Sequence, residues 1–205
     1  HTIKINDNSF VLNTIPSGVF RNNVINVIGN GVVIDPITLI KEIEGLHLIN
    51  VDVEERLLVS QKAHLILPTH RLLDAASEAA KGSKKIGSTL RGIGPTYMDK
   101  TGRNGLRVGD IFSVNFKDKY DTIKAKHLNL LKLYPKITFD LDGEEEKWTR
   151  SLDILRNLQT MSCEYYLNEA IRKGKKILAE GAQGAMLDID YGTYPYVTSS
   201  NTISA

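Results

Sequence analysis

The stretch Ile86 to Asp110, IGSTLRGIGPTYMDKTGRNGLRVGD, is the most distinctive part of the chain. Its apolar residues follow neither the 3.6-residue period of a helix nor the alternation of a strand, so we predict a long loop. Glycine is favoured where the backbone takes positive φ or approaches another group closely, and Pro95 stiffens one corner. The glycines of the stretch are Gly87, Gly92, Gly94, Gly102, Gly105 and Gly109.

The polar residues of this loop are of the kind that bind anions. Arg91, Arg103 and Arg107 carry planar, permanently charged guanidinium groups that suit phosphate or carboxylate. Ser88 and Thr89 add hydroxyl groups. The combination predicts an anion-binding loop. The alternative is a long solvated linker that carries charged residues on its surface.

The composition of the 205-residue chain is that of an ordinary globular protein, with 41 % hydrophobic and 24 % charged residues. The formal net charge of +2 gives no electrostatic reason to expect nucleic acid or a membrane as the main partner. A single cysteine excludes an internal disulfide and suits a reducing compartment. Because we find neither a membrane-spanning apolar run nor a signal peptide, we expect a cytoplasmic protein.

Before the loop, short apolar runs alternate with helical patterns, which is typical of an α/β sheet. One helix is expected to begin at Pro36, because Asp35 can cap its first turn and proline fits the first helical position. A second helix is expected from Pro68 to Lys81. The expected strands are Thr2–Ile5, Phe10–Leu12, Val24–Ile28, Val32–Ile34 and Arg56–Ser60.

After the loop, helical patterns over Tyr120–Tyr134 and Gly143–Arg172 predict a mainly helical subdomain. We therefore predict an α/β fold with a mostly parallel sheet flanked by helices and an inserted, mainly helical subdomain. The expected domain limits are 1–62 for the first part of the sheet domain and 63–172 for the helical subdomain, which includes the glycine-rich loop 86–110. The chain then returns to the sheet domain over 173–205.

A second segment with candidate site residues is Glu180 to Asn201, EGAQGAMLDIDYGTYPYVTSSN. We expect Lys176–Ala179 to be a strand, which places Gln183 at the carboxyl end of a sheet strand, where α/β proteins bind ligands. Thr198 begins a run of four hydrogen-bonding side chains that ends at Asn201. The alternative is that Gln183 and Thr198 only satisfy backbone groups in local turns.

These two segments, the opening His-Thr-Ile and the run GNGVVIDP at Gly29–Pro36 resemble the adenylosuccinate synthetase family, in the same order. That family joins IMP and L-aspartate with GTP as co-substrate and Mg²⁺ as cofactor. The resemblance implies a P-loop-NTPase-like fold and a cytoplasmic homodimer. It also implies that this chain is an internal segment, without the amino-terminal P-loop and the carboxyl-terminal parts that bind guanine and aspartate.

The resemblance implies IMP-binding roles for Thr89, Arg103, Gln183 and Thr198. Thr89, Arg103 and Thr198 match contacts to the IMP phosphate, and Gln183 matches a contact to the base with a part in catalysis. Arg103 matches the arginine that reaches across a dimer interface into the partner's site. Without the resemblance, Arg103 would be taken for a surface arginine in a weak ion pair.

At the start of the chain, His1 matches the histidine of the family's Gly-His-Thr motif, a general acid near the transferring phosphoryl group. Thr2 matches a contact on the GTP side. Without the resemblance, a terminal histidine would be interpreted as the remnant of a tag. Two positions of the loop depart from the family's pattern: Leu90 stands where glycine or lysine is usual, and Ser88 replaces threonine.

No metal site is predicted from the sequence. Asp188 and Asp190 are spaced like loop ligands but lack a full ligand set, and His64 and His70 are expected to pack beside helices. The resemblance implies that the Mg²⁺ ligands and the catalytic aspartate lie outside this chain, so we expect the isolated chain to be inactive. The alternative function is a non-catalytic regulatory module that binds a nucleotide or phosphate with the same loops.

Overall fold

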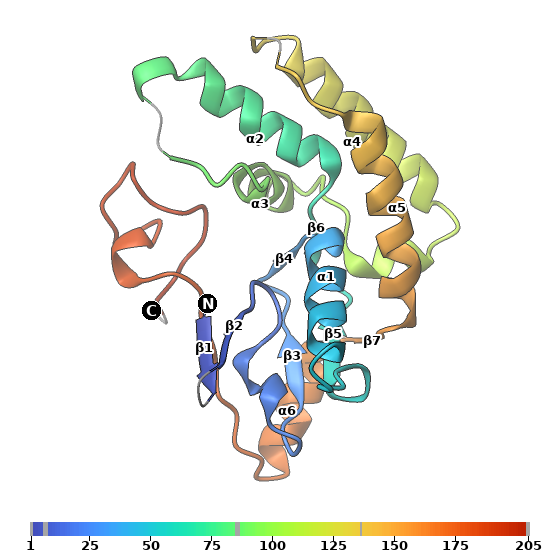
Figure 1. Cartoon of the computed structure of the whole chain (residues 1–205). Coiled ribbons are helices and arrows are strands. Elements are labelled where there is room, and N and C mark those ends of the chain that lie inside the picture. The colour runs from blue at the N-terminus through green and yellow to red at the C-terminus, as the bar shows by residue number, and fades with distance from the viewer. Residues whose placement is uncertain (1, 6–7, 85–86, 136, 204–205) are drawn as a thin grey trace. The chain divides into compact units, whose positions relative to one another are not determined.

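The structure, a computed structural model, describes residues 2–5, 8–84, 87–135 and 137–203. The chain forms two compact units that interleave along the sequence (Figure 1). The first unit contains the chain up to Leu65 together with Arg107–Val114 and Lys147–Leu178. The second contains Ile66–Leu106, Asn115–Glu146 and the chain from Ala179 onward. The sequence predicted three consecutive blocks instead, and those domain limits remain a prediction.

The first unit contains a three-stranded parallel sheet in the order β3-β5-β7. The central strand, β5, is buried along its whole length, as expected for a parallel strand that is covered on both faces. In the register, Val27 of β3 lies opposite Leu58 of β5. The strands are β3 (Asn26–Ile28), β5 (Leu57–Ser60) and β7 (Gln159–Met161).

Two further strand pairs belong to the same unit. The strands β4 (Val33–Ile34) and β6 (His64–Leu65) are parallel, whereas β1 (Thr2–Ile5) and β2 (Asn8–Val11) are antiparallel. With this mostly parallel pairing and the helices between the strands, the predicted α/β fold class is confirmed.

Two helices of the first unit begin at residues that favour a helix start or are buried. The helix α1 (Pro36–His47) starts as predicted: the Asp35 carboxylate accepts the Ile37 N–H at 3.1 Å and proline occupies the first turn. The helix α6 (Cys163–Arg172) starts at the single cysteine of the chain, which is buried. Burial raises the pKa of the Cys163 thiol.

The second unit is mainly helical, and α2 contacts both α3 and α4. Its helices are α2 (Pro68–Ala80), α3 (Ile93–Thr101), α4 (Phe116–Leu131) and the first turns of α5 (Leu141–Asn157). In the part of the chain that the structure describes, no helix combines the length and the apolar character needed to cross a membrane.

Three local predictions are wrong. The stretch 86–110 is not a continuous loop, because it contains α3, whose buried residues Thr96 and Asp99 are polar and leave no apolar period. The expected helical stretch 143–172 is interrupted by β7, whose three residues are stabilised by pairing with the distant β5.

Lys176–Ala179 is the third: it is exposed and is not a strand. A strand needs a neighbour to accept and donate its backbone hydrogen bonds, and no described strand pairs with this segment. Gln183 therefore does not follow a sheet strand as predicted.

Candidate functional site

Two buried carboxylates on α2 hold the backbone of the glycine-rich loop. Glu78 accepts the N–H of Gly87 at 2.7 Å and the N–H of Ser88 at 3.3 Å, both through Oε1. Asp74 accepts the Ser88 hydroxyl at 2.7 Å through Oδ1 and the Gly92 N–H at 2.9 Å through Oδ2. Because these acids are four residues apart, they lie on one face of α2 and bind the loop at both ends.

The charge of Glu78 is compensated within the same cluster. Lys81 binds the other carboxylate oxygen of Glu78 at 2.8 Å. The hydrogen bonds from Lys81 and from the Gly87 and Ser88 N–H groups lower the pKa of Glu78 to about 2. The Glu78 carboxylate is therefore ionised at neutral pH and can accept the loop's N–H groups.

The loop between these contacts takes left-handed backbone conformations. Gly87 has φ 90°, Leu90 has φ 57° and Gly92 has φ 77°. At Gly92, a Cβ atom would lie 2.8 Å from the backbone nitrogen of Arg71 and 2.9 Å from the carbonyl carbon of His70. Glycine is thus needed at position 92 both for its positive φ and for close approach to α2.

Two of the predicted site residues are also left-handed without being glycine. Gln183 has φ 66°, and Arg103 has φ 62° at the end of α3. There the Arg103 N–H donates to the Lys100 carbonyl at 3.2 Å and the Asn104 N–H donates to the Asp99 carbonyl at 2.9 Å. Glycine is the usual residue in such a helix ending. A non-glycine residue here costs about 1–2 kcal/mol, and strain of this kind is concentrated at functional sites.

The two predicted segments meet at α3, within the second unit. The Tyr97 side chain is hydrogen-bonded to Ser200, and burial raises the pKa of Tyr97. One turn earlier, a Cβ atom on Gly94 would lie 3.2 Å from the Ser199 hydroxyl oxygen. The helix that directly follows the first loop therefore packs against the run of hydroxyl side chains that begins at Thr198.

The second segment folds around one of its own carboxylates. Asp188 is fully buried and accepts the N–H groups of Asp190 at 2.9 Å, Tyr191 at 3.1 Å, Thr202 at 2.6 Å and Ile203 at 3.2 Å. Burial alone would raise the pKa of Asp188, but these backbone hydrogen bonds outweigh it and lower the pKa below its ordinary value. Asp188, considered above only as a metal ligand, instead organises the segment that carries Thr198.

The structure groups the predicted IMP contacts in the second unit, where most of them are exposed. These contacts are Thr89, Arg103, Gln183 and the half-buried Thr198. Thr2, predicted on the GTP side, is exposed on β1 of the first unit and is not grouped with them. His1 lies outside the described residues.

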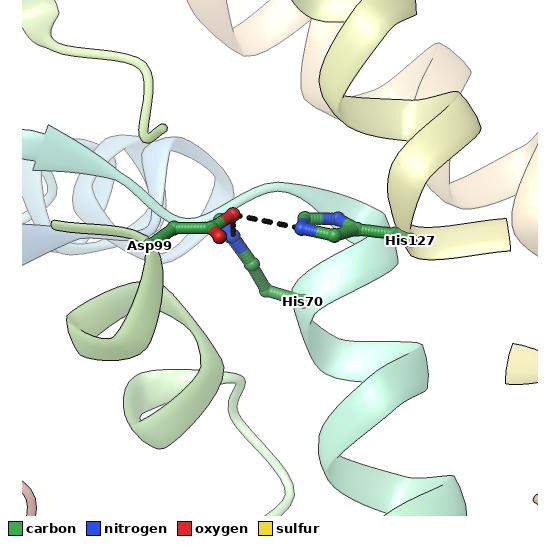
Figure 2. A group of neighbouring side chains, drawn as sticks. All are labelled: His70, Asp99 and His127. Carbon is green, nitrogen blue, oxygen red and sulfur yellow. Dashed lines mark hydrogen bonds and ion pairs between the residues drawn. The ribbon is translucent and has the colours of Figure 1, made fainter. Parts of the chain in front are cut away.

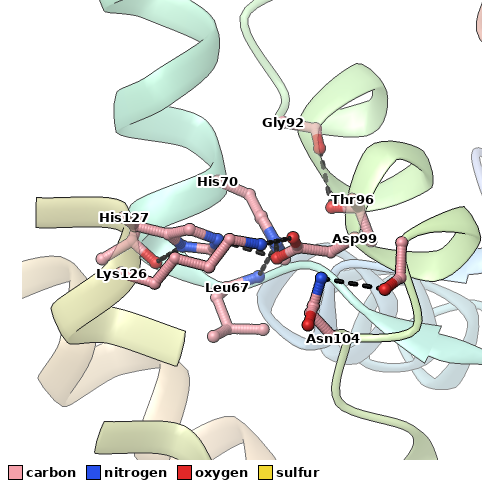
Figure 3. A network of polar contacts seen from close by, with 10 residues as sticks. Leu67, His70, Gly92, Thr96, Asp99, Asn104, Lys126 and His127 are labelled. Carbon is pink, nitrogen blue, oxygen red and sulfur yellow. Dashed lines mark hydrogen bonds and ion pairs between the residues drawn. The ribbon is translucent and has the colours of Figure 1, made fainter. Parts of the chain in front are cut away.

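A buried charge network joins α2, α3 and α4 (Figures 2 and 3). The Asp99 Oδ2 atom lies 3.0 Å from Nε2 of His70 and 2.7 Å from Nε2 of His127, and Lys126 binds Oδ1 at 2.6 Å. Burial alone would raise the pKa of Asp99, but the hydrogen bonds from His127, His70 and Lys126 outweigh it and hold the pKa below its ordinary value. Burial lowers the pKa of His70.

This network does not suit a metal ion. Nδ1 of His70 accepts the Leu67 N–H at 3.0 Å, so Nε2 carries the proton and donates to Asp99. Lys126 places a positive charge on the same carboxylate. We interpret the network as a connection between helices, which agrees with the predicted packing role of His70.

Among the described residues, no group of three neighbouring His, Cys, Asp or Glu side chains offers oxygen ligands alone. Two groups have side chains near enough to share an ion: the buried His70, Asp99 and His127, and the more exposed His47, Asp52 and Glu54. Both groups contain imidazole, whereas Mg²⁺ prefers oxygen ligands in an octahedron. The donor sets therefore do not fit the cofactor that the family uses.

Four residues that shape the site were not predicted in these roles: Asp74, Glu78, Tyr97 and Asp188. One signal was available. Asp74 and Glu78 recur at the spacing of one helical face, just before a loop rich in glycine, and a buried acid requires donors. The Tyr97–Ser200 contact joins residues about a hundred positions apart, and no local pattern indicates it.

Comparison with known proteins identifies relatives of this chain. The family model described as adenylosuccinate synthetase matches residues 1–205. The adenylosuccinate synthetase of Flavobacterium psychrophilum is 56 % identical over the whole chain, which spans 49 % of that protein. The chain thus spans about half the length of its curated relatives.

Two solved structures are also similar. A fully ligated adenylosuccinate synthetase from Plasmodium falciparum has a TM-score of 0.87 and 38 % identity, covering 100 % of this chain and 47 % of the other. A cyanophage S-2L succinoaminodeoxyadenylate synthetase, bound to dGMP and to dATP as an energy donor, has a TM-score of 0.62 and 25 % identity, covering 98 % of this chain and 45 % of the other.

Proposed function

Because the chain belongs to the adenylosuccinate synthetase family, we propose that it supplies the IMP-binding part of an enzyme that converts IMP, L-aspartate and GTP to adenylosuccinate, GDP and phosphate. In the first step, O6 of IMP attacks the γ-phosphate of GTP and GDP leaves. In the second step, the amine of aspartate attacks C6 and displaces the phosphate. The product is on the route to AMP.

The observation that carries this proposal is the meeting of the two segments at α3. Tyr97 and Gly94 bring the segment that begins at Thr198 beside the helix that follows the Thr89 loop. In the proposal, the hydroxyls of Thr89 and Thr198 donate hydrogen bonds to the IMP phosphate. The Gln183 amide, which can both donate and accept, contacts the base and orients it for attack.

The remaining roles concern the GTP side. We assign His1 the general-acid position near the transferring phosphoryl group, and Thr2 a contact to GTP. From the family resemblance, the ligands of Mg²⁺ are expected in parts of the enzyme outside this chain. The enzyme is expected in the cytoplasm, with no nucleic acid or membrane partner, in keeping with the small net charge.

We further propose a homodimer in which Arg103 reaches the IMP site of the partner subunit. Arg103 is exposed at the end of α3, and its guanidinium suits bidentate binding of phosphate. Arg103→Ala and Gln183→Ala full-length enzymes should each be nearly inactive alone. When the two variants are dissociated, mixed and re-associated, half of the dimers contain one subunit of each kind. Each of these dimers has one intact site out of two, so activity should recover to about a quarter of wild type. No recovery would contradict the shared site.

The IMP site is tested by titration of the full-length enzyme. Thr89→Ala and Thr198→Ala should each weaken IMP binding about tenfold or more, because each loses a hydrogen bond to a charged group. The KM for aspartate should stay within about twofold. Thr122→Ala on α4 is the matched control, since its hydroxyl bonds only locally to the Asp118 carbonyl. Unchanged IMP binding in both site variants would contradict the proposal.

An assay of adenylosuccinate formation separates the enzyme from the alternative regulatory module. The full-length enzyme should turn over, whereas the isolated 205-residue chain should not, because it spans only about half the length of its relatives. Nucleotide binding by the full-length protein without turnover would favour the regulatory module. Turnover by the isolated chain would show that the GTP- and aspartate-binding parts were wrongly expected outside it.

A further inference from the structure

We propose that Asp74 and Glu78 are positioning residues that hold the Thr89 loop in the shape that binds the IMP phosphate. This inference rests on the proposed function, because it names residues that serve the same site. Neither carboxylate needs to touch the nucleotide. Both act through the backbone of the loop.

The positions of the hydrogen bonds are the first argument. The carboxylates bind Gly87 and Ser88 on one side of Thr89 and Gly92 on the other. The Leu90 N–H donates to the Ser88 hydroxyl at 3.2 Å, so the shape inside the loop depends on the residue that Asp74 holds. The exposed Thr89 is therefore fixed from both sides.

Backbone strain is the second argument. The loop contains Leu90 in a left-handed conformation, which costs about 1–2 kcal/mol for a residue with a Cβ atom. A short, strained loop does not keep such a shape by itself, and the surrounding structure must impose it. The bonds from α2 to Gly87, Ser88 and Gly92 are the contacts that can do so.

Charge is the third argument. Carboxylates beside a phosphate site repel the ligand unless donors compensate them. Both oxygens of Asp74 accept loop donors, while Glu78 gives one oxygen to the loop and the other to Lys81. Three backbone N–H groups of the loop are already bonded to α2, and we assign the exposed Thr89 side chain as a donor to the phosphate.

Single variants of the full-length enzyme test the proposal. Asp74→Ala removes both acceptors of Asp74, and Glu78→Gln and Ser88→Ala each weaken part of the same set. Each variant should raise the KM and Kd for IMP about tenfold, because bonds to a charged group are lost. The kcat at saturating IMP should change by less than about threefold, since bound IMP restores the loop.

Hydrogen exchange gives a second readout. Exchange at the Gly87 and Gly92 amides should be protected in the wild type and about tenfold faster in the variants. The matched controls are Asp121→Ala and Glu169→Gln, exposed acids that pair with Lys117 and Lys173. Both controls should behave as the wild type does.

A double variant distinguishes positioning from a general loss of stability. Asp74→Ala and Ser88→Ala both remove the bond between Asp74 and Ser88, so together they should weaken IMP binding by clearly less than the product of their separate effects. Multiplicative effects would overturn the proposal. So would wild-type IMP binding or tighter binding in the variants, since tighter binding would mean that the carboxylates compete with phosphate.

The possible failures can be told apart. If the wild-type enzyme binds no IMP, the proposed function fails. If it binds IMP and the variants bind equally well, only the positioning role fails. Should Asp74→Ala not fold, Glu78→Gln and Ser88→Ala decide the matter in the same way.

Discussion

The two candidate segments of the second unit are held in shape by opposite means. In the loop 87–92, the backbone N–H groups are bound by Asp74 and Glu78, which belong to α2. In the segment 184–203, the N–H groups are bound by Asp188, which belongs to the segment itself. Both segments are held by buried carboxylates, but only in the second does the carboxylate belong to the segment itself.

This difference predicts two kinds of sensitivity. The first loop should respond to changes in the neighbouring helix, whereas the second should respond mainly to changes in its own residues. The glycines follow the same division. A Cβ atom on Gly92 would collide with the backbone of α2, and one on Gly192 would collide with the carbonyl oxygens of Met186 and Asp188 inside its own segment.

The largest expected effect is that of Gly92→Ala. The left-handed φ costs about 1–2 kcal/mol and the overlap with α2 adds about 2 kcal/mol, so the free energy of unfolding should fall by about 3–4 kcal/mol. The measurement is chemical denaturation. Gly174→Ala is the control, since it has φ 71° but open space around the added atom, and it should cost only about 1 kcal/mol. Equal losses would mean that contact with α2 is unimportant.

Gly192→Ala should come next, at about 2–3 kcal/mol, because the overlap involves backbone atoms that cannot move independently. Amide exchange should rise at Thr202, whose N–H bonds to Asp188, while the Gly92 amide stays protected. Faster exchange at both amides would show that the two segments do not hold their shapes separately.

A smaller effect is expected at the left-handed side chains. Arg103→Gly relieves about 1–2 kcal/mol of strain and loses about 0.5–1 kcal/mol to chain entropy, for a net gain of about 0.5–1 kcal/mol in stability. IMP binding by the full-length enzyme should nevertheless weaken about tenfold. Leu90→Gly should give the same gain in stability without that loss. A drop in stability for both variants would contradict the assignment of strain.

The smallest effect is a dependence on acid. The pKa of Glu78 falls from its ordinary value of 4.5 to about 2 in the folded protein, so its ionised form stabilises the fold fully above about pH 4.5. That stabilisation is lost as the pH falls from 4.5 through about 2. Stability measured across this range should decline less steeply in Glu78→Gln than in the wild type, with no difference in slope between pH 6 and 8. Parallel curves down to pH 2 would contradict the role of Glu78.

The sequence predicted those parts of the fold whose signals are local. Asp35 and Pro36 marked the start of α1, and the apolar run before Ser60 marked β5, because a cap and a buried strand each need only neighbouring residues. It could not predict α3, whose buried side chains are Thr96 and Asp99, since a helix that buries polar groups has no apolar period.

Features that depend on residues distant in the sequence could not be predicted either. The strand β7 exists through its pairing with β5, about a hundred residues away. For the site, the resemblance supplied Thr89, Arg103, Gln183 and Thr198, and their roles remain predictions. The carboxylates that shape the loops were missed, because an acid gives no sign in the sequence of which N–H groups it will accept.

The buried Cys163 offers a way to follow one unit without disturbing the other. It is the single thiol of the chain, it lies in the first unit at the start of α6, and burial raises its pKa. A thiol-reactive dye should therefore label the native chain slowly, at the rate at which this unit opens. The labelling rate of Cys163 thus reports the opening of the first unit without an engineered cysteine.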